Sequence, residues 1–217
     1  MENTIETFLI SEYNALQARA LGFETILSSR INLFLIVNGA SIAGFSGLSQ
    51  IDNFDFNYKL ILNFLCSINL LIGIVTLKFS KDQSIAITSF QRRAARIRRY
   101  FYDKNPDIYP YLPFYPSDER PKYFIGRSLL IWRGGDPILI VINSLLSGII
   151  SYNLLYEFSN PIGLVVSFLV FFILMILQIK YLEIKLLQRD IDEEKEGKVN
   201  FLNEDLKRKE QARAIKT

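Results

Sequence analysis

The strongest constraint on this chain is the distribution of its charged residues. The centres of four apolar segments, residues 31–47, 58–79, 137–156 and 161–180, contain no Asp, Glu, Lys or Arg, whereas charged residues crowd between them. At about 1.5 Å per residue, a helix over each segment is long enough to cross roughly 30 Å of hydrocarbon, the first only just. The pattern therefore predicts an all-α membrane protein with four transmembrane helices.

Two of these segments begin with helix-start signals. Asp136 precedes Pro137, and Asn160 precedes Pro161, so each proline follows a side chain that can cap a helix. Proline suits the first helical position, where the backbone N–H has no partner within the helix. We therefore expect the third and fourth helices to begin at these two pairs.

The positions of lysine and arginine predict the orientation of the spans. The connections 48–58 and 152–161 contain no basic residue, and Lys59 is the only one near that rim. The other basic residues lie before the first span, between Lys78 and Arg133, and from Lys180 onward. By the positive-inside rule, these three regions are cytoplasmic. We expect a multi-pass protein of the cytoplasmic (inner) membrane with both termini in the cytoplasm. Because the chain opens with acidic and polar residues, we expect no cleavable signal peptide.

The composition excludes much catalytic chemistry. The sequence contains no histidine and a single cysteine, Cys66, which lies within an apolar run. A His general base, a Cys–His nucleophile pair and a Cys/His zinc site are therefore excluded. We expect no enzymatic activity, no catalytic residues, no cofactor and no metal, and we interpret Cys66 as a small buried apolar residue.

Apolar residues continue at helical spacing beyond three of the four spans. A heptad-like seam precedes the first span, at Leu9, Tyr13, Leu16, Ala20, Phe23 and Leu27. An apolar stripe follows the second span, at Ile87, Phe90, Ala94, Ile97 and Phe101. A shorter stripe follows the fourth span, at Ile184, Leu187 and Ile191. We expect one helix over residues 4–47, a second over 58–105, and a fourth that ends near Gly197. Since the seams need partners, we predict that helices 1, 2 and 4 extend into a cytoplasmic helical stalk. The alternative is that they lie on the membrane surface as amphipathic helices.

The predicted organisation has five parts in chain order. These are a cytoplasmic N-terminal helix (1–30), transmembrane helices 1 and 2 (31–79), a cytoplasmic basic helix with an aromatic, proline-rich strap (80–132), transmembrane helices 3 and 4 (133–180), and a cytoplasmic C-terminal helix and tail (181–217).

An arginine stripe marks the second helix beyond the membrane. Arg92, Arg96 and Arg99 share one face, opposite the apolar stripe, and lie roughly 20–30 Å beyond the membrane surface if the helix stays upright. This distance exceeds the Debye length of about 8 Å, so lipid headgroups are not the expected partners. Acidic residues of the fourth helix reach overlapping heights, at Asp190, Asp192, Glu193, Glu194 and Glu196. We predict that the two helices pair, within one subunit or between neighbours. The alternative is that the arginines bind a phosphate-bearing ligand, a nucleotide or RNA.

The strap between the second and third spans is rich in proline and aromatic residues. Repeated prolines between residues 106 and 121 forbid a continuous helix. Its aromatic residues argue against plain disorder, because disordered linkers contain few of them. We interpret the strap as an extended segment packed along the stalk, anchored by Tyr109, Tyr111, Phe114 and Tyr115. The alternative is that these aromatic residues form an exposed surface for a soluble protein or a nucleobase.

Small and uncharged polar residues repeat inside the predicted spans. On the first span, Gly39, Ala43 and Gly47 form a line of small residues, with Ala40 and Gly44 beside it. On the third span, Asn143, Ser147 and Ser151 recur every four residues. Two further polar residues are Asn38 on the first span and Ser67 on the second. Small residues allow helices to approach closely. The polar residues either share hydrogen bonds between helices or line a pore. A pore would need several subunits, because one four-helix bundle is too thin to enclose a channel.

In its helix layout and basic cytoplasmic extension, the chain resembles small prokaryotic multi-helix membrane proteins that accompany antiviral defence systems. Such proteins pair a membrane bundle with a cytoplasmic sensor or a soluble partner, and they permeabilise or depolarise the membrane when triggered. The resemblance covers architecture alone, and no site residue is carried over from it. It implies a pore-type effector.

Two functional hypotheses follow. In the first, a homo-oligomer in the lipid bilayer senses a cytoplasmic partner or ligand and alters membrane permeability as an ion channel. In the second, a non-conducting membrane anchor recruits a soluble partner enzyme through the stalk and the strap. The absence of charged residues from the span centres argues against an ion-coupled carrier.

Overall fold

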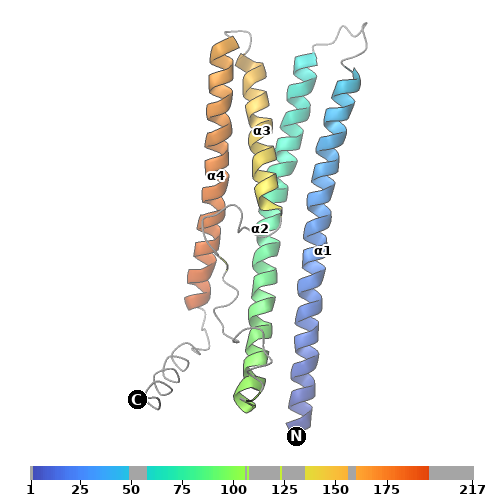
Figure 1. Ribbon diagram of the computed structural model, residues 1–217, viewed down its shortest axis with the longest axis vertical. Helices are drawn as coiled ribbons and strands as arrows, with labels where there is room; N and C mark the ends of the chain where they lie inside the picture. The colour runs from blue at the N-terminus through green and yellow to red at the C-terminus, as the bar shows by residue number, and fades with distance from the viewer. Residues whose placement is uncertain are drawn as a thin grey trace. The chain divides into compact units, whose positions relative to one another are not determined.

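The protein is described from a computed structural model, shown in Figure 1, and the described residues are 2–48, 58–105, 107, 123, 135–155 and 160–195. They form four α-helices, which are α1 (Glu2–Leu48), α2 (Tyr58–Lys104), α3 (Asp136–Leu155) and α4 (Asn160–Lys195). Each helix is long and apolar enough to cross a membrane. This confirms the all-α class and the presence of four helices with the length and composition of membrane spans.

The helix boundaries follow from the positions of proline and from uninterrupted helical sequence. α1 contains no proline and runs without a break through the predicted first span. α2 ends at Lys104, and its last turn is closed by the Asn105 backbone N–H, which donates to the Phe101 carbonyl at 3.0 Å. Pro106 follows directly and disfavours helical geometry at the residue before it. The predicted end of the fourth helix near Gly197 lies outside the described residues.

The chain divides into two compact units. The first contains Met1–Glu24, Ser84–Ile125 and Lys185–Thr217, and the second contains Thr25–Gln83 and Gly126–Ile184. α1, α2 and α4 contribute residues to both units, whereas α3 belongs to the second alone. The second unit includes the four apolar segments, and we call it the membrane unit. The first unit corresponds in sequence to the predicted stalk, whose position relative to a membrane stays a prediction.

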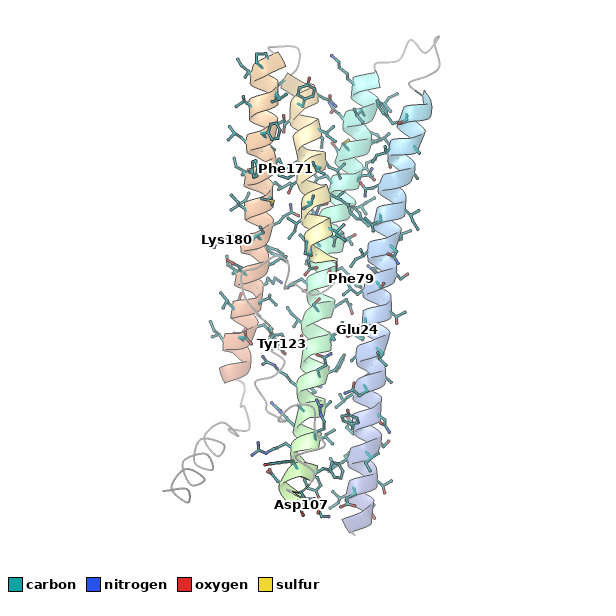
Figure 2. The ribbon with its side chains drawn as sticks, viewed as in Figure 1. Glu24, Phe79, Asp107, Tyr123, Phe171 and Lys180 are labelled. Atoms are coloured by element: carbon teal, nitrogen blue, oxygen red, sulfur yellow. The ribbon has the colours of Figure 1, made fainter. Side chains whose placement is uncertain are left out.

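The core of the membrane unit is a narrow apolar cluster to which every helix contributes. Its buried members are Leu27, Ile31 and Phe34 of α1, Leu77 of α2, Leu139 and Ile140 of α3, and Leu182 of α4. Arg30 places its guanidinium carbon 3.8 Å from the centroid of the Phe79 ring, which is labelled in Figure 2. Large apolar side chains such as Ile36, Phe64 and Phe168 are exposed on the outer faces of the helices. Exposed apolar faces around a small core are the pattern expected of helices that face lipid.

The core of the first unit joins α1 to α2. Leu16, Ala94 and Ile97 are buried together, with Leu9, Tyr13, Phe90 and Phe101 packed against them. Phe23 meets Phe90 edge to face, with ring centroids 5.4 Å apart. Lys104 at the end of α2 forms an ion pair with Glu6 of α1. The predicted α1 seam therefore packs against the predicted α2 stripe.

The apolar stripe predicted for α4 is not buried. Ile184, Leu187 and Ile191 are 62%, 46% and 50% exposed, whereas Leu182 and Leu186 are buried. The stripe is therefore not packed against the described helices of its own chain, and the expected partner for it stays a prediction that concerns another chain. Leu182, Leu186 and Asp190 are spaced by four residues, so the side of α4 that faces the other helices carries two buried leucines together with the carboxylate that pairs with Arg92.

Candidate functional site

A cluster of uncharged polar side chains lies buried inside the membrane unit, between α3 and α4. Asn143 and Ser144 of α3 are fully buried, and Ser147 and Gln178 are 8% exposed. Asn143 Nδ2 donates to Gln178 Oε1 at 3.0 Å, and Gln178 Nε2 lies 3.4 Å from Ser144 Oγ. Gln178 Nε2 also lies 3.3 Å from the Leu174 carbonyl oxygen. We call Asn143, Ser144, Ser147 and Gln178 the polar cluster.

The hydroxyl groups of α3 bond along their own helix. Ser147 Oγ donates to the Ser144 carbonyl at 2.8 Å, and Ser151 Oγ donates to the Ser147 carbonyl at 2.9 Å. Each of these two serines therefore donates its hydroxyl proton to a carbonyl of its own helix. Further along the helix, Asn153 Nδ2 donates to Asn63 Oδ1 of α2 at 3.1 Å. Polar contacts thus join α3 to α4 and, separately, to α2.

The other two polar residues predicted from the sequence are placed differently. Asn38 is buried, and its Nδ2 donates to the Phe34 carbonyl of its own helix at 2.9 Å. Ser67 is exposed on α2, and its hydroxyl donates to the Asn63 carbonyl at 2.7 Å. The structure therefore brings Asn143 and Ser147 together inside the bundle, and it leaves Ser67 on the outside.

Gln178 belongs to the cluster but was absent from the predicted set. It lies close to Lys180 at the end of the fourth span, where a polar residue is expected at the membrane boundary. The sequence signal that could have identified Gln178 is its side chain, which is the only carboxamide between residues 161 and 180. A carboxamide in an apolar run needs a partner, and the Asn143 side chain provides one.

The small-residue lines of α1 lie on its outer side. Gly39, Ala40, Ala43, Gly44 and Gly47 are all exposed. A Cβ built on any of the three glycines meets nothing within 4 Å among the described residues. No described helix of this chain packs against these lines. The close approach predicted for them therefore stays a prediction that concerns contact with another chain.

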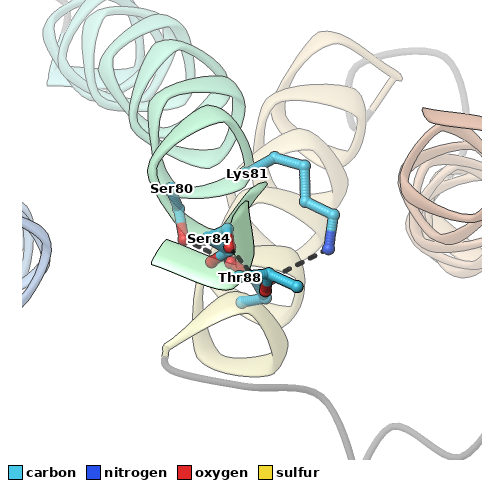
Figure 3. A network of polar contacts seen from close by, with 5 residues as sticks. Ser80, Lys81, Ser84 and Thr88 are labelled. Atoms are coloured by element: carbon cyan, nitrogen blue, oxygen red, sulfur yellow. Dashed lines mark hydrogen bonds and ion pairs between the residues drawn. The ribbon is translucent and has the colours of Figure 1, made fainter. Parts of the chain in front are cut away.

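A buried ion pair lies near one end of the polar cluster's helix. The Ser80 hydroxyl donates to Asp136 Oδ1, and Lys81 Nζ lies 3.7 Å from Asp136 Oδ2 (Figure 3). Ser80 is 0% exposed, Lys81 is 6% exposed and Asp136 is 1% exposed. Sequence reasoning assigned Asp136 to capping of α3. Its carboxylate instead reaches two side chains of α2, so it fixes the start of α3 against that helix.

The basic and acidic helices of the first unit pair within one chain. Arg92 Nη2 donates to Asp190 Oδ1 at 3.0 Å, which confirms the predicted pairing in its intrachain form. Arg92 also places its guanidinium carbon 4.1 Å from the Tyr123 ring centroid, and both side chains are buried. A guanidinium stacked on a ring while bonded to a carboxylate is held in one orientation.

The arginine stripe is largely buried rather than solvated. Arg92 and Arg99 are 5% and 1% exposed, while Arg96 is exposed. Arg99 Nε lies 3.0 Å and 3.1 Å from the two carboxylate oxygens of Asp103. Arg92 and Arg99 are buried because α2 is covered by protein on two sides, and one of them is the side opposite its apolar stripe. The side chains of Glu193, Glu194 and Glu196 lie outside the described residues.

The predicted anchors of the strap, Tyr109, Tyr111, Phe114 and Tyr115, also lie outside the described residues. Two strap residues are described: Asp107, which is exposed, and Tyr123, which is 6% exposed and stacks on Arg92. Sequence reasoning grouped Tyr123 with the end of the strap and gave it no role. Its contact shows that the strap touches the same arginine as α4.

Comparisons with known proteins find no match to this chain among protein-family models, curated proteins or solved structures. Its function is therefore inferred from the residues themselves. The polar cluster in the membrane unit and the buried arginines of the first unit are the two arrangements with chemical content.

Proposed function

We propose that this protein is a homo-oligomeric effector of the cytoplasmic membrane that changes membrane permeability in response to a cytoplasmic partner or ligand. The observation that supports it is the polar cluster. Four polar side chains, two of them fully buried, are gathered between α3 and α4 inside a unit whose helices are largely apolar. Burying polar groups away from water is costly even when they are hydrogen-bonded. Their position inside the bundle fits a role in a hydrophilic path.

The path forms when helices of the membrane unit separate. Asn143 and Ser147 face the interior of a single chain, so they do not lie on a surface that a neighbouring copy lines. Separation of α3 from α2 and α4 breaks the Asn143–Gln178 hydrogen bond and exposes both carboxamides and the serine hydroxyls to water. Neighbouring copies then complete the wall, because one bundle of four helices cannot enclose a channel by itself.

The first unit provides the response to a cytoplasmic signal. Arg92 is shared between Asp190 of α4 and Tyr123 of the strap, so three segments of the chain meet at one guanidinium. Arg96 is exposed one turn further along α2. An anion such as a phosphate group competes with a carboxylate for guanidinium groups. A phosphate-bearing ligand or an acidic partner is thus the class of signal that this unit fits.

The proposal is tested by K⁺ efflux from liposomes that contain the purified protein. Wild-type protein is expected to dissipate the gradient, and Ser147→Leu is expected to lower the efflux by about tenfold, because an apolar constriction excludes water. Ser147→Ala checks that loss of the hydroxyl alone acts in the same direction. The matched control is Thr76→Leu, because the Thr76 hydroxyl bonds the Ile72 carbonyl at an exposed position on α2.

Two results would contradict the proposal. Liposomes with wild-type protein that hold their gradient as well as protein-free liposomes would remove the permeability function. Equal losses of efflux in the Ser147 and Thr76 variants would show that the interior of the bundle is not the path. Size-exclusion chromatography of each variant confirms that assembly is retained.

A second candidate function is a non-conducting anchor that recruits a soluble protein. The exposed α4 stripe of Ile184, Leu187 and Ile191 favours it, because an amphipathic helix with an open apolar side is a common recognition element. A pull-down through a C-terminal tag in mild detergent distinguishes the two. A soluble protein that co-elutes in fixed ratio and is lost in Leu187→Glu supports the anchor, whereas a homo-oligomer alone supports the effector.

A further inference from the structure

The orientation of each carboxamide in the polar cluster is fixed by its neighbours. The Leu174 carbonyl oxygen can only accept a hydrogen bond, so the Gln178 amide nitrogen must face it. Gln178 Oε1 consequently faces Asn143, which must present its own amide nitrogen at 3.0 Å. The remaining atom, Asn143 Oδ1, therefore points away from Gln178, toward α2.

Asn143 Oδ1 meets no donor on α2. It is fully buried and has no hydrogen-bond partner in the described part of the chain. It lies directly against Gly73, where a Cβ would be only 1.8 Å from Oδ1 and 2.8 Å from the Asn143 Cγ. Only a glycine leaves room for the carboxamide at this point, and its Cα–H groups offer no more than weak contacts to the oxygen.

We infer that the Asn143 carboxamide, seated on Gly73, closes the hydrophilic path and is the binding site for the first water that enters when the path opens. This inference rests on the proposed function. A buried acceptor without a partner destabilises the dry, closed bundle, and a water molecule between α2 and α3 supplies the missing hydrogen bond. The close packing of the Asn143 carboxamide on Gly73 stabilises the closed form, whereas its unpaired oxygen favours entry of a water molecule.

The seat and the acceptor are tested by opposite substitutions. Gly73→Ala places a methyl group where Oδ1 lies, so the carboxamide must leave the seat, and K⁺ efflux from liposomes is expected to rise by about tenfold. The double variant Asn143→Leu/Gln178→Leu removes both carboxamides together, so no acceptor is left alone. Its efflux is expected to fall by about tenfold, and its thermal midpoint in detergent is expected to equal or exceed that of the wild type.

A matched control separates the seat from simple crowding of the bundle. Gly148→Ala adds a methyl group to α3 whose nearest neighbour is the Ser167 carbonyl oxygen at 3.4 Å, an ordinary contact. Its efflux is expected to stay at the wild-type level.

The outcomes separate this inference from the function on which it rests. If wild-type protein conducts and both Gly73→Ala and the double leucine variant conduct equally well, the seat is not the closure. A fall in the thermal midpoint of the double variant would show that the carboxamides only hold the helices together. If no protein conducts, the permeability function itself fails. The double variant keeps the test decisive should Gly73→Ala not assemble.

Discussion

Replacing Asp136 with alanine is expected to destabilise the membrane unit by about 3 kcal/mol or more, the largest effect of any single substitution considered for that unit. The carboxylate is 1% exposed and faces Lys81 Nζ at 3.7 Å, with the Ser80 hydroxyl on its other oxygen. Removing it leaves the ammonium of Lys81, whose side chain is 8% exposed, without this counter-charge in a buried site. The measurement is the thermal denaturation midpoint of purified protein in mild detergent.

Two further variants divide this effect into its parts. Asp136→Asn keeps a hydrogen-bond acceptor for Ser80 but removes the charge, so it reports the ion pair with Lys81. Asp82→Ala removes a carboxylate next to Lys81 in sequence that is exposed to solvent, and it is expected to change stability by less than about 0.5 kcal/mol. Equal midpoints for Asp136→Ala and wild type would mean that the pair does not hold α3 against α2.

Reversing the charge of Arg92 is expected to produce a comparable loss in the first unit. Arg92→Asp places a carboxylate where the side chain is 6% exposed and where the wild-type guanidinium lies 3.0 Å from Asp190, so two like charges then face each other. A buried uncompensated charge destabilises by about 3–5 kcal/mol. Hydrogen exchange of the α4 segment from Lys185 to Asp192 is expected to accelerate, while exchange of α3 stays unchanged.

The reciprocal exchange of charges tests whether this pair is the cause. Arg92→Asp with Asp190→Arg restores opposite charges and is expected to recover part of the protection on α4. The recovery is incomplete because the stacking of Arg92 on Tyr123 is lost. Arg93→Asp, an exposed neighbour on α2, is the control and is expected to leave the exchange of α4 unchanged. The pairing is excluded if the exchanged variant is as unprotected as Arg92→Asp.

Helix lengths and one of the packing faces are predictable from sequence because they depend on local patterns. The absence of proline over long apolar and heptad-patterned runs predicts α1 and α2 almost to the residue. The spacing of Leu9, Tyr13 and Leu16 predicts the side of α1 that meets α2. Both are repeating signals that many residues share, so a single exception does not obscure them.

The buried side of α4 is not identified in this way, because Leu182 and Leu186 form a second apolar line beside Ile184, Leu187 and Ile191, and periodicity does not choose between the two. The spacing of Ile184 and Leu187 favours one side, whereas the buried side carries Leu186 and the carboxylate of Asp190, which pairs with Arg92. The same reason applies to the candidate site. Asn143 is visible in the sequence, but Gly73 and Gln178 join it from other helices, and pairwise geometry of that kind has no periodic signal.

The separation of Arg92 and Asp190 along the chain has a consequence for biogenesis. During synthesis the arginine is made 98 residues before its carboxylate, and on the proposed topology α3 and α4 enter the membrane in between. Asp190 reaches the side of the membrane that holds Arg92 only if both of these helices insert, and in the correct orientation. A chain that loses one span, or inserts α4 in reverse, keeps a buried arginine without that carboxylate. On the proposed topology, the pair therefore forms only in chains that have inserted both α3 and α4.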